Sequence, residues 1–301
     1  MEEAAPGVLV RALAAHGAVR VLAVDARGPA EHTRRVHGLG PDASRLGAEA
    51  VVAAALSSAH IKGEEQLTLQ IQGSAPRCAV YADITATGDL RARVTPPDLR
   101  LRPGGESVGN LSAIKSVRLP DGELREVYRG ITEISGRLET ALGHHLASST
   151  QVDAVLRIDC QPGPDDAVRQ AGGLLLERLP GEPGHPELPS EEFAERYGWI
   201  AEAELAQVLT QVAFGMLGGE RLDVLESRPI QWKCRCSTER IENTLVALGP
   251  ATLDEMIGED HGAEVTCHFC GTVYRISEER LRELRDLAAA ARRTVDQESE
   301  R

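Results

Sequence analysis

The sequence predicts a chain of several parts: an α+β or α/β N-terminal domain, a helical linker and a small, cysteine-rich C-terminal domain. Its 301 residues are 42% hydrophobic, which is enough to build more than one core. A proline-rich stretch at residues 179–189 interrupts the succession of apolar runs, and four of the six cysteines lie beyond it. We therefore expect an N-terminal domain over residues 1–179, a linker over 180–231 and a C-terminal domain over 232–301.

The first strands of the N-terminal domain are predicted by their apolar pattern. Residues 19–24 form a short apolar run, and residues 66–72 alternate between polar and apolar side chains with the period of a strand. Residues 79–85 and 90–94 flank a Thr-Gly-Asp turn at 87–89. This arrangement is typical of the two strands of a hairpin.

The longest predicted helix of this domain spans residues 42–60, where alanine is abundant and Asp42 or Ser44 can cap the N-terminus. Because the segment is rich in small apolar side chains, we expect this helix to be buried. The other expected elements are strands at 114–119 and 152–159, a helix at 134–146, an apolar run at 174–176 and a loop at 103–110.

The linker is predicted from its prolines and its charge. Four prolines within residues 179–189 remove backbone donors and restrict the backbone angle φ. Residues 190–217 then show a helical pattern that starts at Ser190 and the two glutamates after it. Residues 180–231 contain ten acidic residues and three arginines, a net charge of −7 out of −13 for the whole chain. An acidic segment that also contains large apolar side chains is predicted to be amphipathic and only marginally stable.

Two close cysteine pairs, Cys234-X-Cys236 and Cys267-X-X-Cys270, are separated by 30 residues. Four thiolates satisfy the tetrahedral coordination of Zn²⁺ without any other ligand, as in a closed structural site. Gly271 follows the second pair directly and permits the positive φ of a turn whose backbone N–H groups point toward the sulfurs. The pattern predicts one Zn²⁺ per chain, bound by Cys234, Cys236, Cys267 and Cys270, and hence a small zinc-binding C-terminal domain.

The single-residue spacing of Cys234 and Cys236 is unusual for a zinc ribbon, which normally uses two Cys-X-X-Cys turns. This pair can bind the same ion, and it can also close to a small, strained disulfide. Thiolates are the form that oxidants attack, and their oxidation would remove ligands from the metal. Metal binding and redox sensing are therefore two states of one site. His261 and His268 are expected at the surface, because four cysteines already fill the coordination shell.

The rest of the C-terminal domain is predicted to contain helices and a hairpin. Ser237 or Thr238 can cap a helix that ends near residue 247, and residues 251–257 can form a second helix. About 60 residues with so small a core need a staple, such as a bound metal. Strands at 263–267 and 272–276, which bracket the second cysteine pair, and a helix at 277–293 complete the domain.

Composition excludes several classes of protein. No apolar run of about 18 residues could span a membrane, and the acidic N-terminus lacks the pattern of a secretory signal, so we expect a cytosolic protein without a membrane partner. With 33 basic against 46 acidic residues, affinity for nucleic acid is not expected. The glycine spacings match no nucleotide-binding motif, and we expect no enzyme. Cys78 and Cys160 are each expected to pack as small apolar residues.

Three segments of the C-terminal domain, residues 232–236, 262–271 and 274–276, show a resemblance to a known family. They read Trp-Lys-Cys-Arg-Cys, Gly-Ala-Glu-Val-Thr-Cys-His-Phe-Cys-Gly and Tyr-Arg-Ile. They are similar to the family of redox-regulated 33-kDa heat-shock chaperones, and the resemblance extends over nearly the whole chain. The N-terminal segments that agree are residues 9–13, 62–63, 67–70, 108–110, 128–130, 171–174 and 179–180.

The resemblance implies a cytosolic, ATP-independent holdase that binds unfolding client proteins under oxidative stress. In this family the reduced form binds zinc and is inactive. On oxidation each neighbouring cysteine pair becomes a disulfide, zinc is released, the linker region unfolds, and the active form is a homodimer. The resemblance thus gives Cys234, Cys236, Cys267 and Cys270 a ligand role and a redox role. Residues 180–231 correspond to the metastable linker, in which we expect client-binding side chains at Phe193, Tyr197, Trp199, Leu205, Val208 and Phe214.

Two alternatives follow from the same cysteines. One is a structural zinc-ribbon adaptor protein without redox switching, against which the Cys-X-Cys spacing and the net charge of −13 argue. The other is a thiol oxidoreductase that uses Cys267 and Cys270. That pair is predicted in a hairpin, whereas a thiolate is activated at a helix N-terminus.

Overall fold

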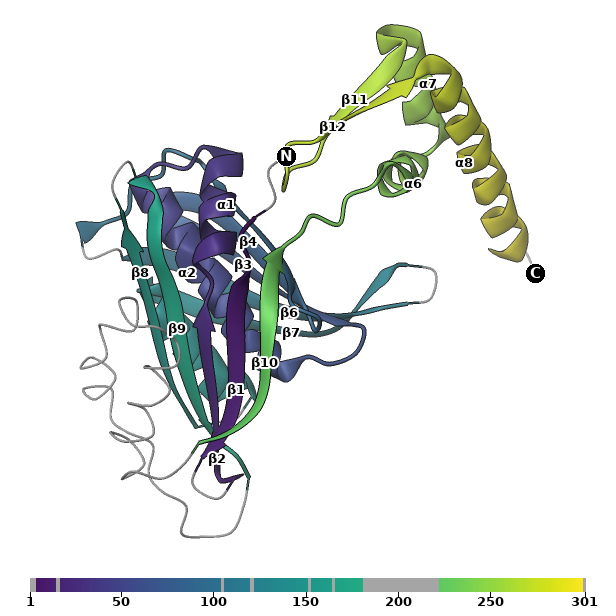
Figure 1. Ribbon diagram of the computed structural model, residues 1–301. Helices are drawn as coiled ribbons and strands as arrows, with labels where there is room; N and C mark the ends of the chain where they lie inside the picture. Colours follow the sequence, from purple (N-terminus) through teal and green to yellow (C-terminus); the bar gives the residue numbers. More distant parts are fainter. Residues whose placement is uncertain are drawn as a thin grey trace. The chain divides into compact units, whose positions relative to one another are not determined.

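A computed structural model of the chain describes residues 4–14, 17–103, 106–119, 122–150, 153–163, 166–180 and 222–299. The chain divides into two compact units, residues 1–233 and 234–301, whose elements are labelled in Figure 1. Within the described ranges, no helix combines the length and the apolar character needed to cross a membrane.

The first unit is built on a ten-stranded sheet in which two antiparallel halves meet at one parallel pair. One half has the strand order β7-β6-β3-β4-β5, and the other has the order β10-β1-β2-β9-β8. The parallel pair joins β5 to β10 over only two positions, Gln231↔Asp89 and Trp232↔Leu90. The strands are β1 (Gly7–Ala14), β2 (Val19–Asp25), β3 (Glu65–Ala75), β4 (Arg77–Thr85), β5 (Asp89–Thr95), β6 (Ser107–Arg118), β7 (Leu124–Gly136), β8 (Ala154–Pro162), β9 (Val168–Arg178) and β10 (Asp223–Trp232).

Helix α2 (Pro41–Ser57) is the centre of the first unit. Fourteen of its 17 residues are buried, and it contacts strands from both halves of the sheet. In Figure 1 it lies between β9 in front and β3 and β4 behind. A helix that is buried on nearly every side needs apolar residues on nearly every face, which explains the abundance of alanine in α2. The other helical elements of the unit are α1 (Arg27–His37), η2 (Ser58–His60), α3 (Leu138–His145) and the π-helical turn η4 (Leu146–Thr150).

The expected buried helix is confirmed as α2, and the expected early strands and hairpin are confirmed as β2, β3 and β4–β5. The cap of α2 differs from the expectation, since the N-cap residue is Gly40 and no side chain caps the helix. Asp42 instead accepts a hydrogen bond from the backbone N–H of Leu101 at 3.1 Å. Ser44 donates to the backbone oxygen of Leu39 at 3.1 Å. Both side chains therefore tie α2 to neighbouring loops.

The helix expected at residues 134–146 begins later than predicted. Ile134 belongs to β7, where it pairs with Gly109 of β6, and α3 begins only at Leu138. Gly136 has a φ of +126° between the two elements. The strand thus uses the apolar Ile134 that the helical pattern had included.

The loop expected at residues 103–110 ends earlier than predicted, because β6 begins at Ser107. A Cβ added to Gly109 would come within 2.1 Å of the backbone oxygen of Gln72 on β3. Glycine at this position therefore permits a close approach of two strands and does not mark a turn.

The end of the expected linker is a strand. Residues 181–221 lie outside the described part of the chain, as do the expected client-binding side chains Phe193, Tyr197, Trp199, Leu205, Val208 and Phe214. Residues 223–231, which we assigned to the linker, form β10 with Trp232 and pair antiparallel with β1. Trp232, which we assigned to the C-terminal domain, is 9% exposed in the first unit, and its indole N–H donates to the hydroxyl of Thr33 at 3.1 Å. Residues 223–231 belong to the sheet because they pair with β1, and Trp232 belongs to the first unit because its indole is buried and hydrogen-bonded there.

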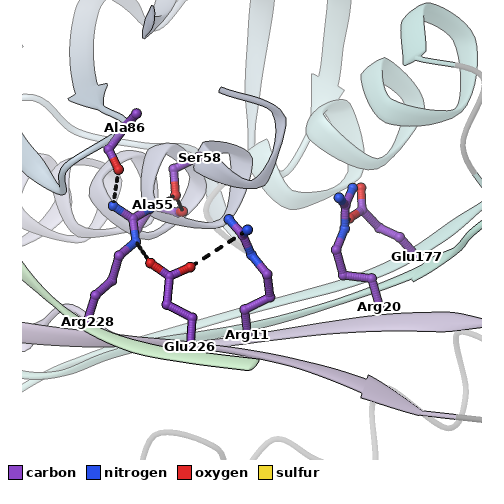
Figure 2. Close-up of polar contacts among 8 residues, drawn as sticks. All are labelled: Arg11, Arg20, Ala55, Ser58, Ala86, Glu177, Glu226 and Arg228. Carbon is purple, nitrogen blue, oxygen red and sulfur yellow. Dashed lines mark hydrogen bonds and ion pairs between the residues drawn. The ribbon is translucent and has the colours of Figure 1, made fainter. Parts of the chain in front are cut away.

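Arg228 joins β10 to elements from distant parts of the sequence (Figure 2). Its guanidinium donates to the hydroxyl of Ser58 at 2.8 Å and to the backbone oxygen of Ala86. Glu226 lies 3.5 Å from Arg228 and 3.7 Å from Arg11 of β1, between the two guanidinium groups. Burial, together with the nearby charge of Arg11, lowers the pKa of Arg228. These contacts fix β10 against the end of α2 and the β4–β5 turn.

The second unit contains α6 (Thr238–Leu248), α7 (Pro250–Asp260), the hairpin β11 (Gly262–Thr266) and β12 (Val273–Ser277), and α8 (Glu278–Ser299). These elements confirm the expected helices and hairpin of the C-terminal domain. Its buried core is small and consists of Leu245, Leu253, Ile276, Leu281, Leu284 and Ala288.

Candidate metal centre

Cys234 and Cys236 lie on the short segment between β10 and α6. The end of this segment is fixed by a helix cap, because the hydroxyl of Ser237 accepts a hydrogen bond from the backbone N–H of Arg240 at 3.2 Å. The guanidinium of Arg240 donates to the backbone oxygen of Arg235 at 2.8 Å. The segment between the two cysteines is therefore bound to the first turn of α6.

Cys267 and Cys270 lie in the turn of the β11–β12 hairpin. The N–H of Cys267 donates to the oxygen of Thr272, and the N–H of Gly271 donates to the oxygen of Cys267, both at 2.9 Å. Gly271 has a φ of +70°, which confirms the expected positive φ. An L-residue with a side chain rarely adopts this conformation, so glycine is needed to close the turn.

The two segments bring the four sulfurs together. The Sγ atoms of Cys234, Cys236, Cys267 and Cys270 all lie within 4.8 Å of one another. The Cys234–Cys267 sulfurs are 3.6 Å apart, and the Cys236–Cys270 sulfurs are 3.4 Å apart. Four Zn–S bonds of about 2.3 Å in tetrahedral geometry would place the sulfurs about 3.8 Å apart. The number, type and spacing of these atoms therefore fit a zinc ion.

Three of the clustered thiols have shifted pKa values. Burial raises the pKa of Cys234 to about 12, and burial also raises the pKa of Cys236. At Cys270 burial acts in the same direction, but hydrogen bonds with Thr272 and with the neighbouring thiols lower the pKa to about 7. Without a cation, a thiolate at Cys270 would thus lie beside the Cys234 and Cys236 thiols, whose pKa values burial raises. A divalent cation would stabilise several thiolates at once.

Two hydroxyl groups that we did not predict contact the sulfurs. The hydroxyl oxygen of Thr272 lies 3.1 Å from the sulfur of Cys270, and the hydroxyl of Tyr274 hydrogen-bonds to Cys236. Such groups orient metal ligands and modify their charge. The contact of Thr272 could have been predicted from the sequence, because this threonine lies only two residues after Cys270.

Among the residues that the structure describes, these four cysteines are the only group of three or more potential ligands gathered for a metal ion. Cys78 is 6% exposed on β4, and burial raises its pKa, as expected for an inert packing residue. Burial likewise raises the pKa of Cys160 on β8. His261 is not part of the group; its Nδ1 lies 3.4 Å from a carboxylate oxygen of Glu278.

The fold and the site together define a class of protein: a large sheet-based unit followed by a small helical unit that is built around a four-cysteine centre of the zinc type. The chain belongs to the Hsp33 family, because the family model described as "Hsp33 protein" matches residues 7–277. The resemblance noted in the sequence is thereby confirmed.

Two relatives and one solved structure support this assignment to the Hsp33 family. The "33 kDa chaperonin" of Enterococcus faecalis is 31% identical over 93% of this chain and 96% of the relative. The protein of the same name from Bacillus subtilis is 32% identical over 92% of this chain and 98% of the relative. A crystal structure of a 33 kDa chaperonin, a heat shock protein 33 homologue from Thermotoga maritima, covers 94% of this chain and 99% of its own with a TM-score of 0.75 at 26% identity. These relatives are named as chaperonins and not as enzymes.

Proposed function

We propose that the chain is a redox-regulated, ATP-independent molecular chaperone, a holdase that oxidative stress activates through zinc release and disulfide formation. Family membership supports the general class of chaperone. The observation that supports the redox step is the gathering of four thiols within 4.8 Å in a unit whose core cluster, among the side chains that the structure describes, has six buried members.

In the reduced state Cys234, Cys236, Cys267 and Cys270 would bind one Zn²⁺ as thiolates. The bound ion would supply positive charge and a rigid cross-link between the β10–α6 segment and the hairpin turn. Ser237, Gly271 and Thr272 hold the sulfurs in position for this role. The two cysteine pairs are separated by 30 residues, so the cross-link closes a loop that contains α6, α7 and β11.

Oxidation by a peroxide would convert each neighbouring pair, Cys234–Cys236 and Cys267–Cys270, to a disulfide. For each pair one S–S bond forms between two thiolates, the O–O bond of one hydrogen peroxide breaks, and two protons taken up from solvent complete two molecules of water. Complete oxidation of the four cysteines thus consumes two peroxide molecules per chain. A disulfide sulfur is not a thiolate, so the oxidised cysteines no longer bind zinc.

Loss of the cross-link would leave the second unit without sufficient stabilisation, because its core is small. We propose that residues 181–221 then act as the metastable linker and release apolar surface, including Phe193, Tyr197, Trp199, Leu205, Val208 and Phe214. The first unit offers apolar surface as well: Val8 is 39% exposed on β1, and Val224 and Leu225 are each 58% exposed on β10. Exposed apolar patches of this kind bind unfolded clients.

The proposal includes a cytoplasmic location, unfolding client proteins as partners and a homodimer as the oxidised, active form. The acidic charge of −13 keeps a protein that exposes apolar surface soluble and makes binding to nucleic acid unfavourable.

The test measures zinc content, free thiols and suppression of client aggregation on the full chain, before and after peroxide treatment at heat-shock temperature. We expect oxidation to release one zinc, to remove four thiols and to increase aggregation suppression. A Cys78→Ala/Cys160→Ala variant is the matched control, because it lacks both other thiols and should respond in the same way. Equal activity in both redox states would refute the switch, and unchanged zinc with no gain in activity would favour a structural zinc-ribbon adaptor. Size-exclusion chromatography of both states tests the homodimer.

A further inference from the structure

The first unit contains a cavity of about 330 Å³ that the proposed redox function does not use. Strands β3, β6 and β7 form its floor, and η2, α3 and the start of η4 line it from the other side. Its volume is at the lower end of the roughly 300–1,000 Å³ that is typical of ligand pockets. The cavity therefore has the size for a small molecule.

The floor of the cavity follows from the register of the three strands. Leu67 of β3 pairs with Lys115 of β6, which pairs with Tyr128 of β7. In the next row on the same face, Leu69 of β3 pairs with Ala113 of β6. The short side chain of Ala113 leaves room above the sheet beside the row of Leu67, Lys115 and Tyr128.

The body of the cavity is apolar. Leu69, Leu142 and Leu146 line it and are at most 2% exposed. Apolar walls of this kind favour an aliphatic group, since its transfer from water is favourable in proportion to the area buried.

Three polar residues, Ser57, His60 and Lys115, line the cavity. Ser57 is 4% exposed, and its hydroxyl has no hydrogen-bond partner among the residues that the structure describes. His60 lies one turn later, and residues three apart in a tight helical turn lie on the same side. The ammonium group of Lys115 donates to the backbone oxygen of His60 at 3.2 Å. A buried hydroxyl without a partner is costly, which makes Ser57 a natural contact for a ligand.

The charge of the lining is unlike that of the chain. Its ionisable groups include Lys115, His60 and His145, and no carboxylate is found among the lining residues that the structure describes, although the net charge of the chain is −13. Burial, and after it the neighbouring His60, lowers the pKa of His145. The cavity is therefore suited to an anionic group.

Carboxylates outside the lining hold the basic groups in place. Lys115 lies 2.9 Å from Glu65, and His60 lies 2.7 Å from Glu177. Glu177 is fully buried and also contacts Arg20 at 2.6 Å (Figure 2). The basic side chains are thus fixed before a ligand arrives. The Lys115 ammonium has three N–H groups, and its contacts with Glu65 and with the backbone oxygen of His60 use two of them. The third N–H can donate to a ligand.

We propose that this cavity binds a small amphipathic carboxylate, of the class of a medium-chain fatty acid. The carboxylate accepts hydrogen bonds from Ser57 and Lys115 beside His60, and the aliphatic chain lies among Leu69, Leu142 and Leu146. The site is independent of the cysteine centre, so its failure and the failure of the redox function are separate results.

The experiment titrates the full, reduced, zinc-loaded protein with octanoate, 1-octanol and octylammonium below their micellar concentrations, and follows binding by calorimetry and methyl NMR. We expect saturable binding of one octanoate per chain, with shifts of the methyl groups of Leu69, Ala113 and Leu142. Because octanoate alone can place a negative charge against the Lys115 ammonium, it should bind about tenfold more tightly than 1-octanol, and octylammonium should bind most weakly.

Matched variants separate the two ends of the ligand. Lys115→Met keeps an apolar stem and should weaken octanoate about tenfold while 1-octanol changes little. Lys233→Met, which removes the charge of a 59% exposed side chain outside the cavity lining, is the control and should leave octanoate binding unchanged. Ala113→Leu fills the cavity and should abolish binding of both compounds. Ser57→Ala should weaken octanoate without lowering the melting temperature of the ligand-free protein, since this hydroxyl has no partner to lose.

The proposal is overturned if no saturable binding occurs. It is also overturned if 1-octanol or octylammonium binds as tightly as octanoate. Persistence of octanoate binding in a folded Ala113→Leu variant would place the ligand elsewhere and would equally refute the site.

Discussion

The two units of this chain are stabilised by different means. In the first unit a buried helix, α2, packs against both halves of a ten-stranded sheet and forms an extended apolar core. In the described part of the second unit, a core cluster of six buried side chains and four clustered thiols hold three helices and one hairpin together. Hydrophobic stabilisation of the first unit is distributed over many residues. Stabilisation by a few clustered thiols can be lost when a single reagent, an oxidant or a chelator, acts on them. The difference teaches how a chain can respond to an oxidant in one unit while the other stays folded.

The largest expected effect is the removal of the metal. Chelation, or the substitution Cys270→Ser, should unfold the second unit and leave the first unit folded. The lost contribution is on the order of 10 kcal/mol, as for small zinc domains in which metal binding and folding are coupled. Amide hydrogen exchange measures this directly, with protection lost in α6–α8 and kept in α2. Cys78→Ala is the control and should keep one zinc per chain. Protection of α6–α8 after chelation would show that the small core suffices without metal.

A pair of core substitutions sharpens the comparison. Leu22 and Leu253 are both fully buried, one in each unit, and each Leu→Ala change should cost about 2–5 kcal/mol. Leu22→Ala should lower the melting temperature of the first unit and leave zinc affinity unchanged. Leu253→Ala should lower zinc affinity, because binding and folding of the second unit are linked, and leave the first unit unchanged. Calorimetry and competition with a chromophoric chelator measure the two effects. Loss of zinc affinity in Leu22→Ala would contradict the independence of the units.

The two units should also depend on pH in opposite directions. Burial raises the pKa of Glu49 on α2 from 4.5 to about 7, although Arg45 and Arg137 oppose the shift. Between these values the folded state keeps a proton that the unfolded state has lost, so the first unit should lose about 3 kcal/mol as the pH rises from about 4.5 to 7. Glu49→Gln should abolish this loss. Zinc affinity of the second unit should instead rise with pH, as the thiols lose protons. Urea unfolding at several pH values tests the first unit, and a wild-type dependence retained in Glu49→Gln would assign it to other groups.

The smallest expected effect concerns two glycines. Gly271 has a φ of +70° in the cysteine turn, so Gly271→Ala should cost about 1–2 kcal/mol and weaken zinc binding about tenfold. Gly143 lies inside α3, where an added Cβ meets nothing within 4 Å, so Gly143→Ala should stabilise the first unit by about 0.5–1 kcal/mol. Zinc competition and thermal melts measure the two changes. Equal effects of both substitutions would mean that backbone conformation at the turn is unimportant.

The local features of the chain could be predicted well from its sequence. The spacing of the cysteines, the glycine after them and the flanking apolar runs predicted the thiol cluster and the hairpin, because all these features lie within a few residues of one another. The abundance of alanine predicted the buried helix α2 for the same reason.

Features that depend on distant partners could not be predicted. Residues 223–231 were assigned to the linker by their acidic charge, but they form β10 because they pair with β1, more than 200 residues earlier. Trp232 was assigned to the C-terminal domain because it adjoins Cys234, but its indole packs 4.3 Å from the ring of His32 on α1. Strand β7 was not predicted from the sequence. Its first six residues, Leu124–Arg129, are all exposed, so they lack the alternation of buried and exposed side chains that is typical of a strand.

The sequence by itself therefore determined the four clustered cysteines, the turn that presents two of them and the family to which the chain belongs. These depend on residue type and short spacing, which a linear pattern contains. Only the tertiary structure decided that β10 joins the two halves of the sheet, that Trp232 packs in the first unit, and that Ser57, Lys115 and Ala113 line one cavity. These depend on contacts between residues far apart in the chain, and such contacts form only when the backbone folds around a common core.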